Sequence, residues 1–284
     1  MKNETYPIAL AGSRPYAKLV TYIQDESVEI DIPDRPLVLV CPGGAYGFTS
    51  DREAEPLAFQ FLAMGYHAAV LRYSVAPATF PTSLCELAWS IRMIREHAGE
   101  WHVNPAQIIV LGCSAGGHLA ASIGVFWNRD FLAKALNAEN ENHNLWKPDG
   151  MILCYPVITS GEFAHRGSFD NVVGDREAEI SAMLDAPAIE ALSLETQVSG
   201  DTPPAFLWHT YTDDAVPVEN SLMFVNAMRR AKVSAELHMY PVGGHGLSLA
   251  NRLTQGQGGS ARQSECTSWI SLAHTWIEGQ FVER

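Results

Sequence analysis

The chain has 284 residues, of which 47% are hydrophobic, and its formal net charge at neutral pH is -13. This length and apolar content suffice for one large α/β domain or for two small domains. An acidic surface repels phosphate backbones and anionic lipid, so we expect neither nucleic-acid binding nor membrane-surface binding. No segment approaches the roughly 18 uninterrupted apolar residues that a membrane-spanning helix requires.

The five cysteines give no sign of a disulfide framework or of a metal site. Their count is odd, they are scattered, and none falls in a C-x-x-C pair. We therefore predict reduced, mostly buried thiols, no bound metal, and a cytoplasmic location. The N-terminal residues 1–7 lack the apolar core of a signal peptide, which agrees with that location. The cysteines are Cys41, Cys85, Cys113, Cys154 and Cys266.

Short aliphatic runs alternate with helical patterns along the chain. Runs that are apolar on both faces are typical of parallel strands covered by helices on both sides. The alternation therefore predicts an α/β fold with a mostly parallel central sheet, and ligands in such sheets bind at the carboxyl ends of the strands. The runs are 37–41, 68–71, 108–111, 151–154 and 205–208, and a more mixed run at 237–240 is expected nearer an edge.

Start and stop signals mark the helices between these runs. Ser50-Asp51-Arg52-Glu53 and Ser83-Leu84-Cys85-Glu86 have the spacing of capping boxes, which predicts helix starts at both places. Gly65 is positioned to end the first helix, and Pro217 fits the first turn of a later one that carries Leu222, Val225 and Met228. A last helix is predicted at about 264–278.

Two long stretches interrupt this alternation, at 127–148 and 158–204. We predict a single domain over residues 1–284 in which both stretches are surface insertions. Long connections inside compact domains are often functional. The second insertion is therefore expected either to form a small cap over the site or to be plain surface decoration.

Gly112-Cys113-Ser114-Ala115-Gly116 follows the aliphatic run at 108–111 and precedes a helical pattern of small residues. A G-x-S-x-G motif between a strand and a helix is a sharp turn that exposes the serine hydroxyl above the sheet. The motif alone often occurs by chance, but this setting favours a nucleophile. We therefore predict Ser114 as a catalytic nucleophile.

A nucleophilic serine needs a base, and the base needs an acid that fixes its tautomer. His245 follows the last strand-like run and has glycines on both sides, a setting that no other histidine shares. Asp213 stands four residues ahead of Pro217, in the loop after the run at 205–208, and is the predicted acid. Asp214 remains the alternative acid, although it is better suited to a turn or a helix N-terminus.

The third requirement is a set of backbone N–H groups for the oxyanion of the tetrahedral intermediate. One donor is expected to be the amide after the nucleophile, that of Ala115. The others are expected in the glycine-rich loop at 42–47, which follows the strand at 37–41 and in which glycines leave amides accessible.

These motifs resemble the α/β-hydrolases, and more narrowly the esterase/lipase-like branch grouped with acetyl esterases and hemicellulose-associated carbohydrate esterases. The resemblance covers most of the chain, with matching motifs at 41–48, 71–77, 112–119, 155–161 and 202–210. It implies an α/β-hydrolase fold with a small cap-like insertion.

The same resemblance implies a triad of Ser114, Asp213 and His245. It also implies oxyanion amides from Gly44 and Ala45 beside that of Ala115, by their position in the H-G-G-G motif of related esterases. The chain departs from that motif because Pro42 replaces the histidine and Ala45 the third glycine. Backbone donors survive both changes.

The substrate class follows from the resemblance. It implies a serine carboxylesterase that needs no cofactor and removes short acyl groups, chiefly acetyl, from hemicellulose-derived oligosaccharides. The partner is then a small acyl ester or an acetylated oligosaccharide, and a homo-oligomer stays open. Aromatic residues near the site would line the acyl pocket or stack on a sugar, although each also fits the core. The candidate contacts are Tyr46, Phe48, Tyr73 and Trp208, with His165 and Arg166 in the insertion.

Two other functions stay open. A serine peptidase of the prolyl-oligopeptidase type shares this hydrolase core, but the chain lacks room for a propeller domain and marks no acidic pair for a peptide amino group. A non-enzymatic binding protein on a hydrolase fold would usually have lost a triad residue. A glycosidase requires paired carboxylates across a sugar site, and the sequence marks no such pair.

Overall fold

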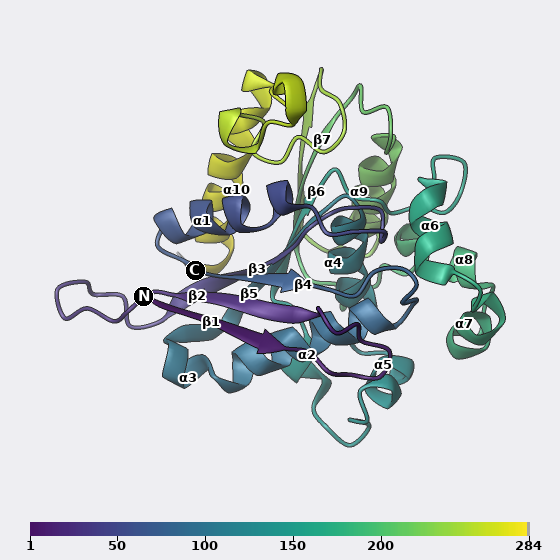
Figure 1. Cartoon of the computed structure of the whole chain (residues 1–284), viewed down its shortest axis with the longest axis horizontal. Helices are drawn as coiled ribbons and strands as arrows, with labels where there is room; N and C mark the ends of the chain where they lie inside the picture. The colour runs from purple at the N-terminus through teal and green to yellow at the C-terminus, as the bar shows by residue number, and fades with distance from the viewer. Residues whose placement is uncertain (283–284) are drawn as a thin grey trace.

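The strands of the protein form one eight-stranded sheet in the order β1-β2-β4-β3-β5-β6-β7-β8. A computed structural model describes residues 1–282 and is drawn in Figure 1. β2 runs antiparallel to both of its neighbours, and all other adjacent strands are parallel, so the predicted mostly parallel sheet is confirmed. The strands are β1 (Lys2–Pro7), β2 (Lys18–Ile23), β3 (Arg35–Cys41), β4 (His67–Arg72), β5 (Val103–Cys113), β6 (Gly150–Cys154), β7 (Ala205–Thr210) and β8 (Ala235–Tyr240).

Helices cover both faces of the sheet, as Figure 1 shows with α1 and α10 on one side and α2 and α3 on the other. The central strand β3 is buried on both faces. Leu37 and Leu39 pack toward α2 and α4, whereas Val38 and Val40 pack toward α1 and α10. The longer helices are α1 (Glu55–Ala63), α2 (Thr82–Glu96), α4 (Ala115–Phe126), α6 (Arg166–Val173), α7 (Glu177–Leu184), α9 (Glu219–Arg230) and α10 (Trp269–Ile277), and the short ones are α3 (Ala98–Trp101), α5 (Asp130–Ala135) and α8 (Ala188–Ala191).

The first two strands were not predicted from the sequence. β1 is largely exposed and carries polar residues, so it lacks the aliphatic run that marks the other strands. Its place at the edge of the sheet explains this composition, because only one of its sides pairs with another strand. β8 occupies the opposite edge, in agreement with its mixed sequence.

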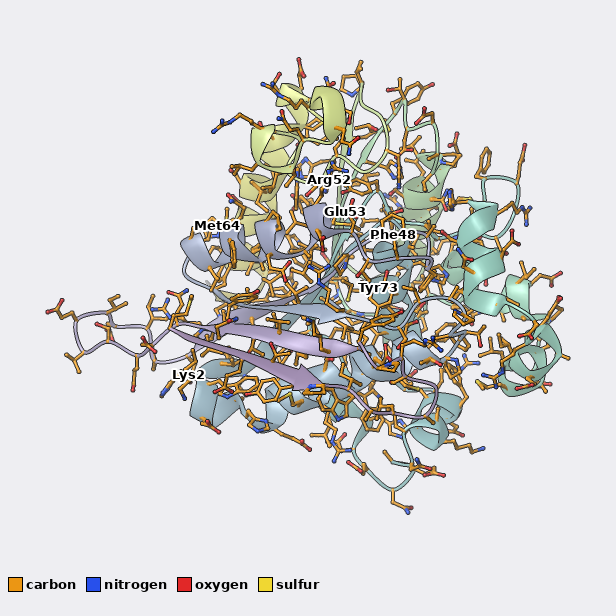
Figure 2. All side chains as sticks on the ribbon, in the orientation of Figure 1. Lys2, Phe48, Arg52, Glu53, Met64 and Tyr73 are labelled. Carbon is orange, nitrogen blue, oxygen red and sulfur yellow. The ribbon has the colours of Figure 1, made fainter. Side chains whose placement is uncertain are left out.

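Neither predicted capping box forms, although a helix begins close to each motif. Ser50 directly precedes a short 3-10 turn, η1 (Asp51–Glu53), ahead of α1, but its side chain makes no capping hydrogen bond, and Ser83 lies inside α2, which begins at Thr82. Figure 2 labels Glu53 on that turn. The glutamates of both motifs are buried and accept hydrogen bonds from loop amides instead, Glu53 from Gly43 and Glu86 from Ser74. A buried carboxylate needs hydrogen-bond donors, and these loop amides supply them, so the glutamates do not turn back to cap a helix.

The remaining helix boundaries differ less from the predictions. Gly65 follows the end of α1 with φ +95°, as expected for a stop signal. Pro217 precedes α9 rather than lying in its first turn, and Leu222 on that helix is exposed. The C-terminal helix at 264–278 is divided into a 3-10 turn, η6 (Ser264–Ser268), the helix α10 and a π-helical turn, η7 (Glu278–Val282).

The insertion at 158–204 contributes α6, α7 and α8, which Figure 1 shows on the side toward which the arrow of β4 points. This is the carboxyl edge of the parallel strands, where a ligand is expected. All five cysteines are free and buried, as predicted. Within residues 1–282, no helix combines the length and the apolarity needed to cross a bilayer.

Candidate active site

Ser114 lies at the sharp turn between β5 and α4. Its backbone has φ 54° and ψ -119°, an uncommon conformation for a residue with a side chain. The turn is fixed because the Ser114 amide donates to the carbonyl oxygen of Cys154 at 3.0 Å. Only glycine fits on either side: a Cβ atom on Gly112 would lie 2.1 Å from the Gly116 oxygen, and one on Gly116 would lie 2.1 Å from the Cys41 oxygen. The local sequence therefore forces the hydroxyl outward at the end of β5.

His245 reaches this hydroxyl from the loop after β8. Its Nε2 atom lies 2.7 Å from the Ser114 Oγ atom. Gly246 follows with φ +69°, a conformation that glycine adopts without strain. The ring of Tyr155 packs edge-on against the imidazole at a centroid distance of 5.2 Å, which restricts its orientation.

Asp213 holds the other side of the imidazole, with its Oδ2 atom 2.7 Å from His245 Nδ1. Its Oδ1 atom accepts the backbone amides of Ala215 and Val216 at 3.0 and 2.9 Å. Burial acts to raise the pKa of Asp213, but the hydrogen bonds from His209 and His245, the charge of His245 and the amide of Val216 outweigh it and lower that pKa. Asp213 therefore stays an ionised acceptor.

Asp214 takes no part in this arrangement. Its side chain is exposed, and the His245 ring meets the neighbouring carboxylate instead. The structure thus brings together Ser114, His245 and Asp213, which are the three residues that the sequence analysis combined.

A cavity of about 290 Å³ opens at Ser114 and His245. The loop after β3 supplies Gly44, Ala45 and Phe48 to its wall, and η1 and the residue before it supply Ser50, Arg52 and Glu53. His165 closes it from the insertion at 158–204.

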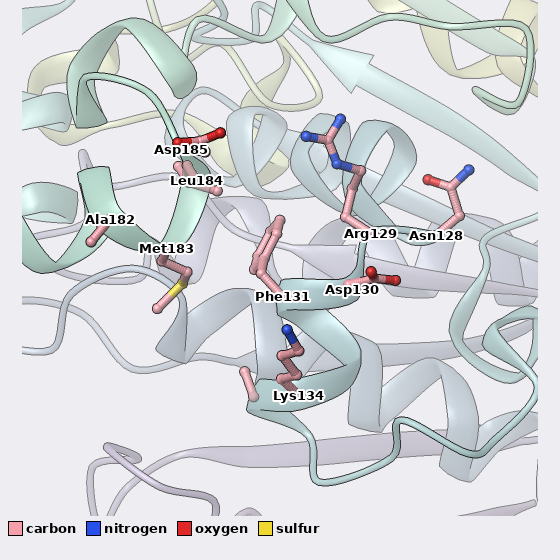
Figure 3. A pocket seen from close by; sticks show the side chains of 10 residues that line it. Asn128, Arg129, Asp130, Phe131, Lys134, Ala182, Met183, Leu184 and Asp185 are labelled. Atoms are coloured by element: carbon pink, nitrogen blue, oxygen red, sulfur yellow. The ribbon is translucent and has the colours of Figure 1, made fainter.

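A larger cavity of about 790 Å³ lies elsewhere, between α5 and α7. Figure 3 shows its wall, with Phe131 between Met183 and Arg129. None of the site residues predicted from the sequence lines it. The predicted catalytic residues Ser114 and His245 line the smaller cavity instead.

The predicted oxyanion loop is strained and faces this smaller cavity. Gly44, Ala45 and Tyr46 have φ values of 132°, 54° and 57°. Strained backbone persists only where its surroundings hold it. Tyr73 Oη donates to the Pro42 oxygen at 2.6 Å, and Asn171 Nδ2 from α6 donates to the Ala45 oxygen at 2.9 Å.

The predicted oxyanion amides are not used by hydrogen bonds among the described residues. Within the described part of the chain, the N–H groups of Gly44 and Ala45 donate to no protein oxygen. The Ala115 N–H is the first of α4, so it has no acceptor within that helix. Three amides are thus available around Ser114 for a ligand oxygen.

Three aromatic residues predicted as substrate contacts lie in the core, and that prediction is wrong for them. Tyr46 and Tyr73 have exposed fractions of 3% and 0%, and Trp208 has 0%. The Tyr46 hydroxyl is bonded to His118 Nδ1 at 2.9 Å. Trp208 lies in β7 and stacks on Trp269 at 5.2 Å. Tyr46 and Tyr73 are buried in the core on one face of the sheet and Trp208 in the core on the other, so their rings do not line the cavity at Ser114.

The two candidates from the insertion differ from each other. His165 lines the cavity beside Ser114. Arg166 is exposed, donates to the Gly161 oxygen at 2.9 Å and is absent from the cavity wall. The prediction of a substrate contact therefore loses its support for Arg166 and stays open for His165.

Sequence reasoning missed Glu53 and Tyr155. Glu53 has an exposed fraction of 4% and forms part of the cavity wall. Its spacing from Ser50 fitted a capping box, which concealed its position in the cavity that Ser114 also lines. A buried glutamate six residues after a strand-following glycine loop carries no distinctive sequence signal of its own.

Comparisons with known proteins place the chain in a family. Residues 29–228 match the family model described as BD-FAE. The chain belongs to the BD-FAE family. It is 33% identical to Endo-1,4-beta-xylanase B of Butyrivibrio fibrisolvens over 82% of its own length, and 28% identical to an acetylxylan esterase of Xylanibacter ruminicola over 77%.

The fold is shared with a solved structure, that of the acetyl ester-xyloside bifunctional hydrolase from Caldicellulosiruptor lactoaceticus. The TM-score is 0.76 at 35% identity, covering 94% of this chain and 89% of the other. This member of the BD-FAE family therefore lies in the esterase branch of the α/β-hydrolases. The relatives support a carboxylic ester hydrolase as its enzyme class.

The chain spans only part of its curated relatives. It covers 35% of the xylanase and 43% of the acetylxylan esterase. The name of the xylanase thus describes a protein most of which lies outside the matched region.

Proposed function

We propose that the chain is a serine carboxylesterase that removes short acyl groups, chiefly acetyl, from hemicellulose-derived oligosaccharides. The observation that carries this proposal is the continuous hydrogen-bonded series from Ser114 through His245 to Asp213, at a cavity walled by unpaired amides. The acetylxylan esterase among the relatives supports the acetyl group and the sugar.

The reaction begins when His245 Nε2 accepts the proton of Ser114 as Oγ attacks the acyl carbonyl carbon. The amides of Gly44, Ala45 and Ala115 donate to the oxyanion of the tetrahedral intermediate, and each such donor contributes about 3–4 kcal/mol in related chemistry. The imidazolium returns its proton to the departing alcohol oxygen, which leaves an acyl-enzyme. Water then repeats the attack with His245 as base and releases the acid.

Asp213 contributes by fixing the tautomer of His245. Its Oδ2 atom accepts Nδ1–H, so Nε2 is left free to accept the serine proton. Because the pKa of Asp213 is lowered, the carboxylate also stabilises the imidazolium that forms in each step.

The size of the cavity favours a small acyl group. Its volume of about 290 Å³ lies just below the usual range for ligand pockets, about 300–1,000 Å³. The exposed ring of Phe48 on its wall suits contact with an apolar or sugar surface.

His165 is the best candidate for a polar contact to the alcohol part of the substrate. The Ser168 amide donates to His165 Nδ1 at 3.3 Å, so the neutral ring carries its proton on Nε2. Burial, followed by the charge of His245, lowers the pKa of His165 and favours that neutral form. A neutral N–H donor beside Ser114 suits a sugar oxygen.

Glycosidase chemistry has less support. Glu53 is the one carboxylate among the described residues that line the cavity, and both of its oxygens already accept hydrogen bonds. A retaining or inverting glycosidase needs two carboxylates facing each other across the sugar.

We also propose a cytoplasmic location on the strength of the five free cysteines.

The proposal is tested by measuring acetate release from acetylated xylo- and manno-oligosaccharides, with Ser114→Ala alongside. Release by the wild type and not by the variant is expected. Cleavage of p-nitrophenyl acetate without oligosaccharide turnover would contradict the sugar substrate while keeping the esterase. Turnover of an aminoacyl amide in place of acetyl esters would favour the peptidase alternative.

A further inference from the structure

The buried carboxylate of Glu53 lies next to the nucleophile and uses both oxygen atoms. Oε2 accepts the Gly43 amide at 3.0 Å, and Oε1 accepts the Tyr155 hydroxyl at 2.7 Å. A Cβ atom on Gly43 would lie 2.6 Å from Glu53 Oε2 and 3.0 Å from Ser114 Cβ. The carboxylate, the glycine amide and the serine are thus in close contact.

Gly43 is the residue before the strained stretch that carries the proposed oxyanion amides. Gly44 and Ala45 follow directly, with φ values of 132° and 54°. The hydrogen bond from Gly43 to Glu53 fixes the start of this stretch. Because oxyanion donors must be held at the position of the developing charge, that fixed start bears directly on their geometry.

The other oxygen of Glu53 leads to the histidine loop. The Tyr155 hydroxyl that donates to Glu53 also accepts the amide of Ser248 at 2.9 Å. The same Tyr155 ring packs edge-on against His245. Glu53 and Tyr155 therefore form a continuous hydrogen-bonded path from the oxyanion loop to the loop that carries the base.

Neighbouring contacts reinforce this path from the same turn. Arg52 Nη2 donates to the Gly246 oxygen at 2.8 Å, and the Ser248 hydroxyl donates to the Arg52 oxygen at 2.7 Å. Figure 2 labels Arg52 and Glu53 side by side on η1. The turn before α1 is thus bonded to the loop after β8, which lies 194 residues away in the chain.

We propose that Glu53 is a positioning residue that sets the oxyanion loop, residues 42–47, against the histidine loop, residues 243–248. The proposal rests on the proposed function, because it presumes that the amides of Gly44 and Ala45 receive an oxyanion. A carboxylate is required because two separate oxygens must each accept a hydrogen bond. Glutamine has one acceptor oxygen, so it can accept only one of these two hydrogen bonds. If it accepts the Gly43 amide, the Tyr155 hydroxyl loses its acceptor.

The test compares Glu53→Gln, Tyr155→Phe and the double variant with wild type on p-nitrophenyl acetate. We expect Glu53→Gln to lower kcat by about tenfold to hundredfold with KM within about twofold, since misplaced donors act on the transition state. Affinity for a trifluoromethyl ketone, which forms an oxyanion on the serine, should fall in parallel with kcat. The double variant should lose no more than the worse single variant, because both changes break one path.

Asp149→Asn is the matched control. Asp149 also accepts one backbone amide and one side-chain donor, from Ile108 and Arg95, both on its Oδ2 atom, and it directly precedes β6, at the opposite, amino end of that strand. This variant should lose stability and keep kcat and ketone affinity near the wild-type values.

The outcomes separate this inference from the proposed function. Equal kcat losses in Glu53→Gln and Asp149→Asn at matched stability, or a change in KM alone, would overturn the positioning role. Strictly additive losses in the double variant would also overturn it. If Glu53→Gln does not fold, Tyr155→Phe carries the same test. Wild-type activity in Ser114→Ala would instead remove the proposed function, whatever Glu53→Gln does.

Discussion

The Oδ2 atom of Asp213 lies 2.7 Å from Nδ1 of His245, although 32 residues separate them in the chain. β8 occupies that interval and returns the chain to the same edge of the sheet as the end of β7. The carboxylate is buried beneath the imidazole and is further held by two backbone amides. The imidazole of His245 is thus oriented by a carboxylate that is itself held by the backbone.

We expect Asp213→Asn to lower kcat by about 10⁴-fold, because an amide at this position no longer enforces the tautomer with Nε2 free. The adjacent Asp214→Asn is the control, since Asp214 is exposed and outside the hydrogen-bonded series. It should leave kcat within about twofold. Steady-state kinetics on p-nitrophenyl acetate measure both, and an equal loss in the two variants would contradict the assignment of the acid.

The sequence was sufficient for the elements that obey local patterns. The aliphatic runs predicted six of the strands, because buried parallel strands are apolar on both faces. The glycines around Ser114 and His245 marked turns that only glycine permits. The spacing between Asp213 and Pro217 then indicated the third residue of the triad. These features are each encoded within about ten neighbouring residues.

Features that depend on distant contacts escaped prediction. Glu53 follows Ser50 at capping-box spacing, yet the Gly43 amide and the Tyr155 hydroxyl determine where its carboxylate points. Likewise Tyr73 and Trp208 carry rings that suit either a core or a pocket, and only the packing of helices on the sheet decides between them. Such choices are made by tertiary structure rather than by local sequence.

The two kinds of aromatic residue near the site should respond differently to substitution. Phe48 lines the cavity with 62% of its side chain exposed, so Phe48→Ala should raise KM for acetylated oligosaccharides several-fold with little loss of stability. Trp208→Phe should cost about 1–3 kcal/mol of stability and leave KM unchanged, because it leaves a gap against Trp269 in the core. Thermal unfolding and KM, measured on both, check the contrast. A raised KM in Trp208→Phe would contradict the placement of that residue.

His165 should affect recognition of the alcohol more than the chemistry. We expect His165→Phe to raise KM for an acetylated oligosaccharide by about tenfold, while p-nitrophenyl acetate, which lacks sugar hydroxyls, keeps its KM and kcat; this is the loss of about one hydrogen bond. Arg166→Ala, next in sequence and outside the cavity wall, is the control. Equal effects on both substrates would count against a contact to the sugar.

The stability of the protein should fall in mild acid because of His118. Burial lowers the pKa of this residue to about 4, against about 6.5 in the unfolded chain. Its Nε2–H donates to the Leu192 oxygen and its Nδ1 accepts the Tyr46 hydroxyl, so the folded protein holds the neutral ring. Between these two pKa values the unfolded chain binds a proton that the folded chain does not, and the free energy of unfolding therefore decreases as the pH falls.

Within that window, His118 alone changes the free energy of unfolding by up to about 1.4 kcal/mol per pH unit. His118→Gln should remove it, so the difference in unfolding free energy between wild type and variant should shrink from pH 7 toward about pH 4.5. The lowered pKa of Asp213 changes the free energy of unfolding only below about pH 3.9, the pKa of an unfolded aspartate, and this lies outside the window. Urea titrations across the range measure the effect, and parallel curves for the two proteins would contradict it.

The most direct test of the account is to identify the residue that carries the acyl group during turnover. Wild type is mixed rapidly with p-nitrophenyl acetate, quenched in acid, and its peptides are analysed by mass spectrometry. The account predicts a burst of p-nitrophenol and one acetyl group on the peptide that contains Ser114, with neither in Ser114→Ala. An acetyl group on a different residue, or turnover that continues in Ser114→Ala, would contradict the assignment of Ser114 as the nucleophile.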